Sequence, residues 1–316
     1  MKALITGSRG FVGAYLRREL EEHGYTVTGL DIAADAQTLA VDIGSPEQVR
    51  ESVRLTQPDV IFHLAGQANV ALSWQIPQKT FELNVLGMIN LLEAVRLEKP
   101  TAKIVGIGSS DQYGNLGEAG KNVTEETPMR PQTPYAVSKK TQEEIAAVYC
   151  RAYGLQVCMT RSFNHAGAGQ KPGFLIPDFA GGIARVESGK AEYLSVGNLT
   201  AKRDFTHVKD VVRAYRLIAE AGKSGEVYNI GSQTVYSAQE ILDQLLALAT
   251  REIPVRQDPA KMRPSDTPVI CCDHSKLTRD TGWMPKIPMG EILSEVLCEW
   301  REKTATENPD NVTNHV

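Results

Sequence analysis

Three polar residues in the first half of the chain have the types and spacing needed to move a proton at a reacting oxygen. Tyr135 and Lys139 are four residues apart in the run YAVSK, so on a helix they would share one face. We expect the ammonium group of Lys139 to lower the pKa of the phenol from its free value of about 10. Such a phenol can give its proton to an alkoxide while Ser109 hydrogen-bonds the same oxygen. A surface helix residue is the alternative for Tyr135 taken alone.

A glycine-rich turn near the amino end has the pattern that holds a dinucleotide. Residues 7–13 read GSRGFVG, and they lie between an expected strand and an expected helix. Glycines let the backbone approach a pyrophosphate, and the start of a helix supplies N–H groups and partial positive charge. The alternative is a tight strand–helix turn without a ligand. We expect the cofactor contacts here to come from Gly7, Arg9, Gly10, Phe11, Val12 and Gly13.

Residues after the second and third strands suit the adenosine half of the same cofactor. Asp31 ends its strand, where a carboxylate accepts hydrogen bonds from a ribose diol and repels a 2′-phosphate. This favours NADH, whereas Arg9 could pair with a 2′-phosphate, so NADPH stays possible. Asp42 and Ile43 could hold the adenine, with a helix-capping carboxylate as the alternative for Asp42.

Small residues at the end of a further strand would let a flat cofactor pass beneath them. These residues are Leu64, Ala65 and Gly66, and we interpret the preceding His63 as a packed histidine rather than a catalyst. The nicotinamide would then lie beside Tyr135 and Lys139. Its positive ring would reinforce the effect of Lys139 on the phenol, and its ribose hydroxyls could bond the ammonium.

Apolar runs and amphipathic segments alternate through the first half and predict the elements that position these residues. The expected strands are Lys2–Thr6, Thr26–Asp31, Val60–Leu64, Ile104–Ser109 and Gln156–Arg161. The expected helices are Gly10–Glu22, Pro46–Leu55, Phe81–Glu98 and Tyr135–Tyr153. This alternation predicts an α/β fold with a Rossmann-like, doubly wound parallel sheet.

The second half is less regular, which predicts a smaller C-terminal domain that binds the substrate. The cofactor domain is expected to span residues 1–163, with 205–237 returning to it. The substrate domain is expected to combine 164–204 and 238–302, and the polar residues 303–316 to form a frayed tail.

Composition and charge exclude several classes of protein. The chain has 316 residues, a formal net charge of −4 and no outstanding cluster of Lys or Arg, which argues against a nucleic-acid surface. No apolar run is long enough to cross a bilayer or to form a signal peptide. Five cysteines without paired spacing fit a reducing compartment, so we expect a cytoplasmic protein without a metal site.

The segment Phe81–Glu98 carries apolar residues on more than one face. A helix that is apolar all round is buried, either in the core or in a contact between two copies of the chain. We expect this helix and its neighbour Tyr135–Tyr153 to pair with the same two helices of a second copy, which gives a homodimer with a four-helix contact.

Taken together, these motifs resemble the extended short-chain dehydrogenase/reductase family over roughly residues 1–300. The resemblance implies a Rossmann-like NAD(P) domain, a small nucleotide-sugar domain and a catalytic Ser109, Tyr135 and Lys139. The run RSFNHAGAGQ (161–170) is similar to a stretch in the branch that reduces GDP-4-keto-6-deoxy-D-mannose to GDP-6-deoxy-D-mannose (GDP-D-rhamnose). Parts of this run recur in the sister GDP-mannose 4,6-dehydratases, so they support a GDP-sugar more firmly than a reduction.

The same resemblance implies a set of substrate-binding residues. Asn164 would hold the sugar or diphosphate, and two arginines would neutralise the diphosphate, since planar guanidinium groups match phosphate oxygens. A surface salt bridge is the alternative for each arginine. The full set is Ser109, Ser110, Asp111, Asn164, Lys190 near the guanine, Arg203, Arg263 and Asp266 at the nucleotide ribose.

Two chemistries remain open on these residues. A 4,6-dehydratase needs an extra carboxylate base, and Asp111 lies two residues after Ser109, where such a base would be. Reduction is favoured because Ser109 replaces the usual dehydratase threonine, the run RDFT (203–206) replaces RDWG, and the chain lacks dehydratase insertions. A nucleotide-sugar 4-epimerase and a non-enzymatic NAD(P) sensor are further alternatives, although sensors usually lack the tyrosine or lysine.

Overall fold

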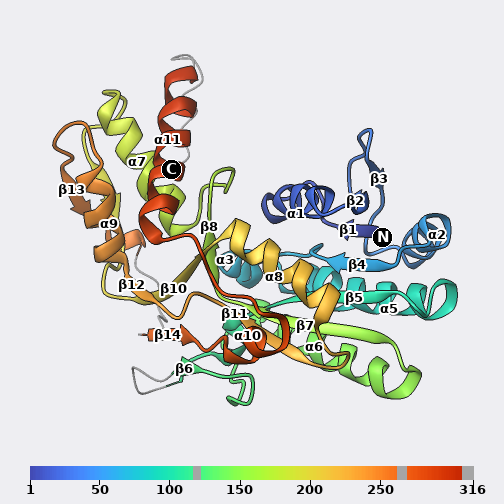
Figure 1. Ribbon diagram of the computed structural model, residues 1–316. Coiled ribbons are helices and arrows are strands. Elements are labelled where there is room, and N and C mark those ends of the chain that lie inside the picture. Colours follow the sequence, from blue (N-terminus) through green and yellow to red (C-terminus); the bar gives the residue numbers. More distant parts are fainter. Residues whose placement is uncertain (117–121, 262–268, 308–316) are drawn as a thin grey trace.

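The larger lobe of the protein is built on a parallel sheet of seven strands. The computed structural model describes residues 1–116, 122–261 and 269–307. The strand order is β11-β7-β5-β4-β1-β2-β3, and every neighbouring pair is parallel (Figure 1). The strands are β1 (Lys2–Thr6), β2 (Thr26–Asp31), β3 (Thr38–Ala40), β4 (Val60–His63), β5 (Lys103–Ser109), β7 (Gln156–Ser162) and β11 (Val227–Ile230). This confirms the predicted doubly wound fold, with the strand order reversing between β1 and β4.

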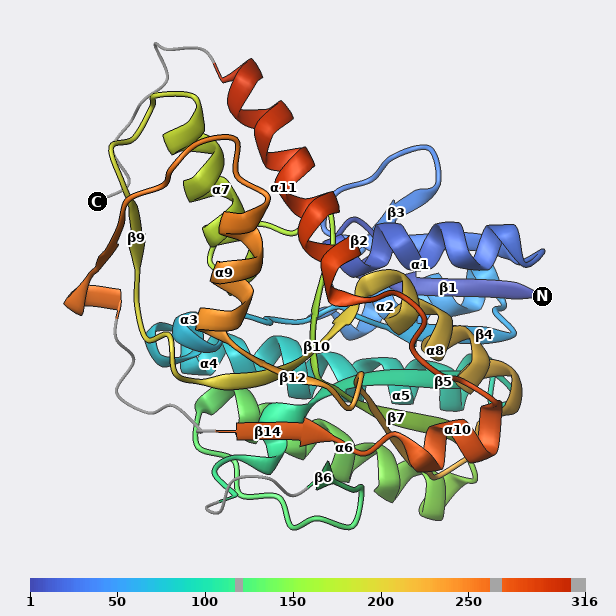
Figure 2. The same cartoon turned by 60° about the vertical axis from the view of Figure 1, so that its left-hand side comes forward.

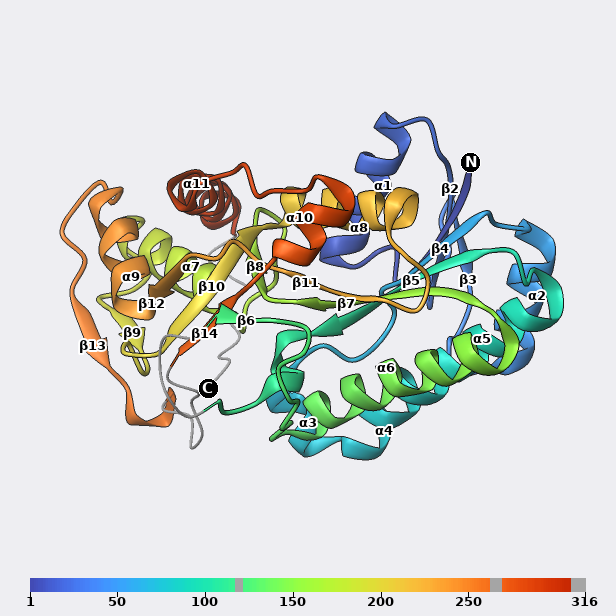
Figure 3. The ribbon, with the colours of Figure 1, turned by 60° about the horizontal axis from the view of Figure 1, so that its bottom comes forward.

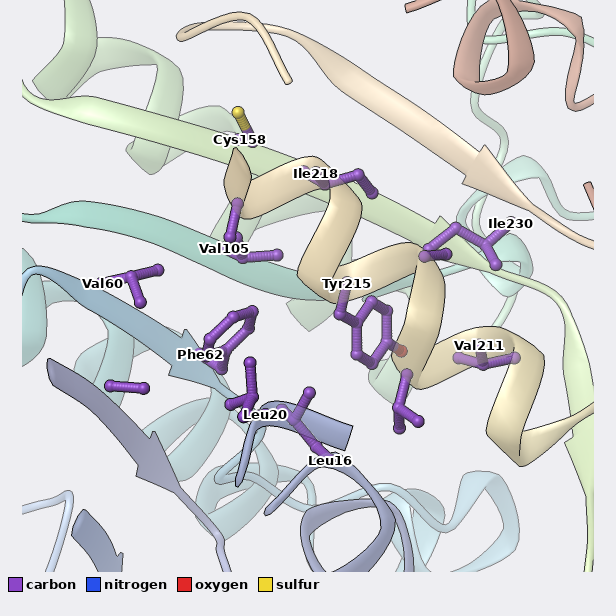
Figure 4. Packing of buried hydrophobic residues seen from close by; sticks show 14 of the residues in the cluster. Leu16, Leu20, Val60, Phe62, Val105, Cys158, Val211, Tyr215, Ile218 and Ile230 are labelled. Atoms are coloured by element: carbon purple, nitrogen blue, oxygen red, sulfur yellow. The ribbon is translucent and has the colours of Figure 1, made fainter. Parts of the chain in front are cut away.

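Helices cover both faces of this sheet (Figure 3). One face carries α1 (Phe11–Glu22) and α8 (Val208–Ala221), and the other carries α2 (Pro46–Thr56), α5 (Gly87–Glu98) and α6 (Pro134–Tyr153). Side chains of a strand alternate between the faces, so Val60 and Phe62 join the core under α1 and α8 whereas Ile61 joins the other core (Figure 4). Both faces are therefore buried, as parallel sheets require.

The smaller lobe is mainly helical and has its own apolar core (Figure 2). It contains α7 (Leu175–Glu187), α9 (Ala238–Ala247) and α11 (Met289–Thr306), with β9 (Leu194–Val196) paired in parallel with β13 (Val255–Gln257). Its core is formed by buried side chains that include Ile176, Phe179, Ile241, Leu245, Ile292 and Leu293.

A second sheet and several short helices complete the fold. The sheet has the order β12-β10-β14-β6, and β8 also pairs with β10. Its strands are β6 (Asn122–Val123), β8 (Asn164–Ala166), β10 (Lys202–His207), β12 (Val235–Ser237) and β14 (Val269–Cys272). The short helices are α3 (Val70–Gln75), α4 (Pro77–Phe81), the π-helix η1 (Glu82–Leu86), the 3₁₀ helices η2 (Ser110–Tyr113) and η3 (Pro259–Lys261), and α10 (Ser275–Thr281).

The segment expected to be one helix over Phe81–Glu98 is interrupted by η1. Asn84 explains the interruption, because its amide group is fully used by other elements. Its Nδ2 donates to Gln67 O (3.1 Å) and Ser138 Oγ (2.9 Å), and its Oδ1 accepts from Gln67 N (2.8 Å). Holding Asn84 in this position widens the helix by one residue, which is how π-turns form within α-helices.

Two stretches of the second half of the chain differ from the predicted domain boundaries. Helix α11 continues to Thr306, four residues into the expected tail, because Lys190 Nζ bonds Thr304 O (2.5 Å) and Glu307 O (3.0 Å) at its end. Leu277 of α10 and Trp283 pack in the core of the larger lobe, although 238–302 was expected to belong to the smaller one. The Trp283 Nε1 donates to Asp210 O (2.9 Å) on α8, and this bond holds the segment around Trp283 against the larger lobe.

Within the ranges given above, no helix has the length and apolar character of a membrane span. In the same residues, no three His, Cys, Asp or Glu side chains gather in a way that could ligate a metal ion.

Candidate active site

The glycine turn between β1 and α1 is shaped by close backbone contacts. Gly7 has φ +70°, and a Cβ there would lie 2.9 Å from Ala65 N at the end of β4. A Cβ on Gly13 would lie 2.5 Å from Gly7 O, so no side chain fits at either position. Helix α1 begins at Phe11 with Gly10 as its N-cap, and no side chain of the described residues caps it. The predicted turn is thus a close-packed helix start with free N–H groups, which fits a pyrophosphate.

Asp31 and Arg9 meet at the same edge of the sheet, as predicted. The Asp31 Oδ2 accepts from the backbone N–H of Arg9 (2.9 Å), and its Oδ1 accepts from Ile32 N–H (2.8 Å). The Arg9 guanidinium turns to Ala34 O (3.4 Å) and Asp35 (3.8 Å). The carboxylate is therefore fixed beside the glycine turn, while the guanidinium is half exposed and held by weak contacts.

The other predicted cofactor residues lie at adjacent strand ends. Ala65 N donates to Thr6 Oγ1 (3.1 Å), and Leu64 N to Thr6 O (3.2 Å), so both follow β4 directly beside β1. Gly66, the next residue, begins the loop to α3. Asp42 accepts from Gly44 N (2.8 Å) in the turn before α2, and the N-cap of that helix is Ser45 rather than Asp42. Ile43 is buried, and its carbonyl accepts from Asn90 Nδ2 (2.9 Å) on α5.

The structure brings Ser109 and Tyr135 together in a buried place. Ser109 ends β5 and is 9% exposed, and Tyr135 lies in the first turn of α6 and is 8% exposed. Ser109 is near enough to lower the pKa of the phenol, and the negative charge of Asp111 is near enough to raise it. The Ser109 Oγ also accepts from Asp111 N (3.2 Å), which ties Asp111 to the same loop. Ser110, the first residue of η2, is buried.

The expected acidification of Tyr135 by Lys139 is wrong for the protein by itself. Burial raises the pKa of Tyr135 well above its usual value, and the negative charge of Asp111 raises it further, against a smaller opposing effect of Ser109. The Lys139 ammonium instead donates to Ile107 O (2.7 Å) and Gln142 Oε1 (3.0 Å). The phenol of the protein by itself is therefore protonated at neutral pH.

Lys139 is a buried cation beside this phenol. Its side chain is 5% exposed, and burial lowers its pKa to about 8. The nearby His63 is fully buried, and burial together with Lys139 lowers the pKa of His63 to about 3. The neutral imidazole is hydrogen-bonded through Nδ1 to Thr6 Oγ1 (2.9 Å). These contacts support the interpretation of His63 as a packed histidine.

A buried network that the motifs did not predict lies under the proposed catalytic residues. Gln112 Oε1 accepts from Ser109 N–H (2.9 Å), and its Nε2 donates to Glu143 Oε2 (2.9 Å). Arg161 binds Glu143 with two bonds, Nε to Oε2 (2.9 Å) and Nη2 to Oε1 (2.6 Å). Two spacings could have indicated it: Gln112 is three residues after Ser109, and Glu143 is four after Lys139 on the same helix face.

The predicted substrate residues are only partly brought together. Asn164 begins β8, two residues after Ser162, which pairs in register with Ser109. Arg203 lies one strand further on β10, opposite Tyr236 and Ile270. Lys190 is bonded to the end of α11, as described above, and no contact joins it to Ser109 or Tyr135 among the described residues. Arg263 and Asp266 lie outside the described residues.

The parallel sheet, the glycine turn and the buried Ser–Tyr–Lys group define an NAD(P)-dependent enzyme of the extended short-chain dehydrogenase/reductase type. The sequence family described as GDP-mannose 4,6 dehydratase matches residues 4–296, and the chain belongs to this family.

Comparison with known proteins shows relatives of two activities. GDP-6-deoxy-D-mannose reductase of Pseudomonas aeruginosa is 33% identical over 97% of this chain and 99% of its own length. GDP-mannose 4,6-dehydratase of Vibrio cholerae is 28% identical over 94% of this chain and 93% of its own. A solved structure of RMD from Pseudomonas aeruginosa with NADPH superposes with a TM-score of 0.87 at 32% identity, over 96% of this chain and 99% of the other.

Proposed function

We propose that the protein reduces the 4-keto group of GDP-4-keto-6-deoxy-D-mannose with NAD(P)H and forms GDP-6-deoxy-D-mannose. The observation that carries this proposal is the burial of Tyr135 together with Ser109 at the end of β5, with the phenol protonated at neutral pH. A protonated phenol can supply the proton that the reduction of a keto group requires. The similarity to the reductase of Pseudomonas aeruginosa over nearly the whole chain supports the same substrate.

Each catalytic residue has a defined task in this reaction. NAD(P)H supplies the hydride to the sugar carbon when it is bound. Ser109 orients the keto oxygen by a hydrogen bond, and Tyr135 gives its proton to that oxygen as negative charge develops. Lys139, held by Ile107 O and Gln142, places a positive charge under the site and stabilises the phenolate that remains.

The substrate contacts form the second part of the proposal. Asn164 lies just beyond the strand end that carries Ser162 and is offered as the residue that holds the sugar or diphosphate. The remaining assignments rest on resemblance: Arg203 and Arg263 for the diphosphate, Asp266 for the nucleotide ribose and Lys190 for the guanine. The contacts of Lys190 with α11 do not favour its assignment.

The test mixes the protein with the 4-keto sugar nucleotide and reduced cofactor, and follows the absorbance of the reduced nicotinamide. The proposal predicts loss of absorbance in step with formation of GDP-6-deoxy-D-mannose. Consumption of cofactor without this product would reject the substrate, and no consumption at all would reject the reduction. A non-enzymatic NAD(P) sensor would also show no consumption.

A GDP-mannose 4,6-dehydratase is the second candidate, and Asp111 is the observation that favours it. Its carboxylate acts on Tyr135 and lies in the loop of Ser109, where a base for proton removal from the sugar would be needed. The matching family also bears that activity in its description. Conversion of GDP-mannose to a keto sugar without net use of cofactor would support it, and interconversion of 4-hydroxyl epimers would support a 4-epimerase.

NADH is the proposed preferred cofactor, with NADPH as an alternative. The Asp31 carboxylate is fixed by two backbone N–H groups at the end of β2, where a 2′-phosphate would meet its negative charge. The similar RMD structure contains NADPH, which supports the alternative. In the Asp31→Ser variant, the KM for NADPH should fall about tenfold relative to the KM for NADH, as expected for the loss of one charge contact. An unchanged ratio would reject the assignment of Asp31.

A homodimer through a four-helix contact, in the cytoplasm, completes the proposal. Large apolar side chains are exposed along α5 and α6, and these two helices would pair with their copies. The residues concerned are Leu97 (47% exposed), Val137 (38%), Val148 (45%) and Tyr153 (56%). Sedimentation of wild type and Val148→Asp tests this contact, which predicts a dimer and a monomer respectively. All five thiols are free, which fits a reducing compartment.

A further inference from the structure

The two catalytic elements of the site are joined by one buried side chain. Ser109 belongs to the β5–η2 loop, whereas Tyr135 and Lys139 belong to α6. Gln112 spans the gap, because its Oε1 accepts from Ser109 N–H (2.9 Å) and its Nε2 donates to Glu143 Oε2 (2.9 Å) on α6. One planar amide thus connects the backbone of the serine to the helix of the tyrosine.

The far end of this connection is itself fixed. Glu143 is 6% exposed, and both of its carboxylate oxygens accept bonds from Arg161 of β7 (2.9 and 2.6 Å). Arg161 Nη1 also donates to Tyr113 OH (2.9 Å) and Glu125 O (2.8 Å). The carboxylate can therefore not swing toward another partner, and a fork-shaped pair of bonds fixes its plane.

The side-chain amide of Gln112 is closely packed against β5. Gln112 is fully buried, and a Cβ on Gly108 would lie 2.6 Å from its Oε1 and 2.2 Å from Thr160 O. Gly108 is thus the residue that lets the amide approach the backbone of β5. A buried amide with both ends bonded has the precision needed to set the distance between two other groups.

We propose that Gln112, held by the Glu143–Arg161 pair, is a positioning residue that sets the hydroxyl of Ser109 against the phenol of Tyr135. It touches neither substrate nor cofactor. Its role is to hold Ser109 and α6 at the separation at which the serine and the tyrosine bond the same oxygen. Loss of the amide lets the η2 loop shift relative to α6, and displacement of a reacting group by about 1 Å can cost about 10²-fold in rate.

The experiment compares Gln112→Leu with Tyr228→Phe as a control. Tyr228 is as fully buried as Gln112, and its hydroxyl accepts from Lys223 N (3.0 Å) and donates to Asp280 Oδ2 (3.1 Å), neither of which belongs to the Glu143–Arg161 network. Both variants lose buried hydrogen bonds, but only Gln112→Leu loses the connection to Ser109. We expect kcat of Gln112→Leu to fall by about 10- to 100-fold with unchanged KM for the cofactor, and Tyr228→Phe to keep its kcat.

A double variant separates positioning from general weakening of the fold. If Gln112 acts through Ser109, then Ser109→Ala with Gln112→Leu should be no slower than Ser109→Ala alone. Rate losses that multiply in the double variant would overturn the proposal, and so would equal losses in Gln112→Leu and Tyr228→Phe. Should Gln112→Leu not fold, Gln112→Asn replaces it, since its amide is one methylene too short to span both partners.

This inference rests on the proposed function for its assay, and the two can fail separately. A wild-type protein that does not oxidise NAD(P)H with the keto sugar rejects the reductase. The same variants are then measured in conversion of GDP-mannose, which uses the same serine and tyrosine. A wild-type enzyme that is active in either assay, together with a Gln112→Leu variant as fast as Tyr228→Phe, rejects only the positioning role.

Discussion

Two buried cations lie near the carboxyl ends of β5 and β7, and their surroundings differ. Lys139 and Arg161 are both 5% exposed. Arg161 has a carboxylate partner in Glu143, whereas Lys139 has a carbonyl and an amide, and no carboxylate of the described residues pairs with it. Burial lowers the pKa of Lys139 to about 8. Burial also acts to lower the pKa of Arg161, but its bonds to Glu143 raise it overall.

The difference separates the frame of the site from its chemistry. A buried charge with a fitted partner holds elements together, and removing one partner leaves the other uncompensated. A buried charge without such a partner costs stability and is retained where a ligand or a reaction uses it. This contrast supports the proposal that the region around Lys139 and Tyr135 is the reacting centre and that the region around Arg161 is its support.

The largest effect should come from removing the proton donor of the reacting centre. We expect Tyr135→Phe to lower kcat by about 10²- to 10⁴-fold, because proton transfer to the developing alkoxide is lost. Cofactor binding should remain, since the glycine turn is untouched. Steady-state kinetics and cofactor titration measure the two properties. Tyr153→Phe, at the exposed end of the same helix, is the control and should keep full activity.

The second largest effect should come from breaking the buried ion pair between Glu143 and Arg161. Glu143→Gln should lower the free energy of unfolding by about 3–5 kcal/mol, because Arg161 then keeps a buried charge without its carboxylate. Urea unfolding measures this change. Glu187→Gln is the control, since its partner Arg301 is 36% exposed and can be rehydrated, and its loss should be about 1 kcal/mol. Equal losses in the two variants would contradict the comparison.

A third prediction concerns Lys139, whose replacement should raise the free energy of unfolding, whereas replacement of Glu143 should lower it. The folded protein holds the pKa of Lys139 at about 8, against 10.5 for a free lysine, so below pH 8 it carries the cost of a buried charge. Lys139→Met should therefore be more stable than wild type at pH 7 by about 3 kcal/mol. Wild type gains stability as the pH rises from 8 to 10.5, so the difference in stability between the two proteins should shrink over this range and vanish above it. Unfolding curves of this variant and of Lys140→Met, a partly exposed neighbour, test the effect.

The smallest effect belongs to the smaller lobe. Hydrogen bonds from Arg301 lower the pKa of Glu187 to about 2, below its usual 4.5. This carboxylate contributes stability above pH 4.5, and the contribution is lost as the pH falls toward 2. After solvent screening at Arg301 we expect about 1–2 kcal/mol. Thermal unfolding between pH 4.5 and 2 should fall less steeply in Glu187→Gln than in wild type. Parallel curves would show that the pair carries no pH-dependent stability.

The regular half of the chain could be predicted from sequence because periodicity and turn chemistry agree there. β1 and β2 have the expected bounds, and the glycine turn and Ser109 lie at the expected strand ends. Parallel strands bring their carboxyl ends to one edge, so residues that follow strands meet in space. This rule places Ser109 at that edge, whereas Tyr135 reaches it from the first turn of α6, the helix that leads into β7.

The rest depended on contacts between distant segments, which spacing cannot reveal. The π-turn at Asn84 arises from bonds to Gln67 and Ser138, and the sequence pattern showed only an apolar helix. The raised pKa of Tyr135 follows from its burial and from Asp111, neither of which a four-residue spacing to Lys139 predicts. The proposed substrate residues Asn164 and Arg203 lie on the short strands β8 and β10, where no regular repeat predicts neighbours.

The most direct test of the account follows the hydride itself. The protein is incubated with GDP-4-keto-6-deoxy-D-mannose and a reduced cofactor dideuterated at nicotinamide C4, and the product is analysed by NMR and mass spectrometry. The account predicts one deuterium at C4 of the sugar for every cofactor oxidised, and almost none with Tyr135→Phe. A sugar product without deuterium, or turnover of GDP-mannose with no net oxidation of the cofactor, would contradict it.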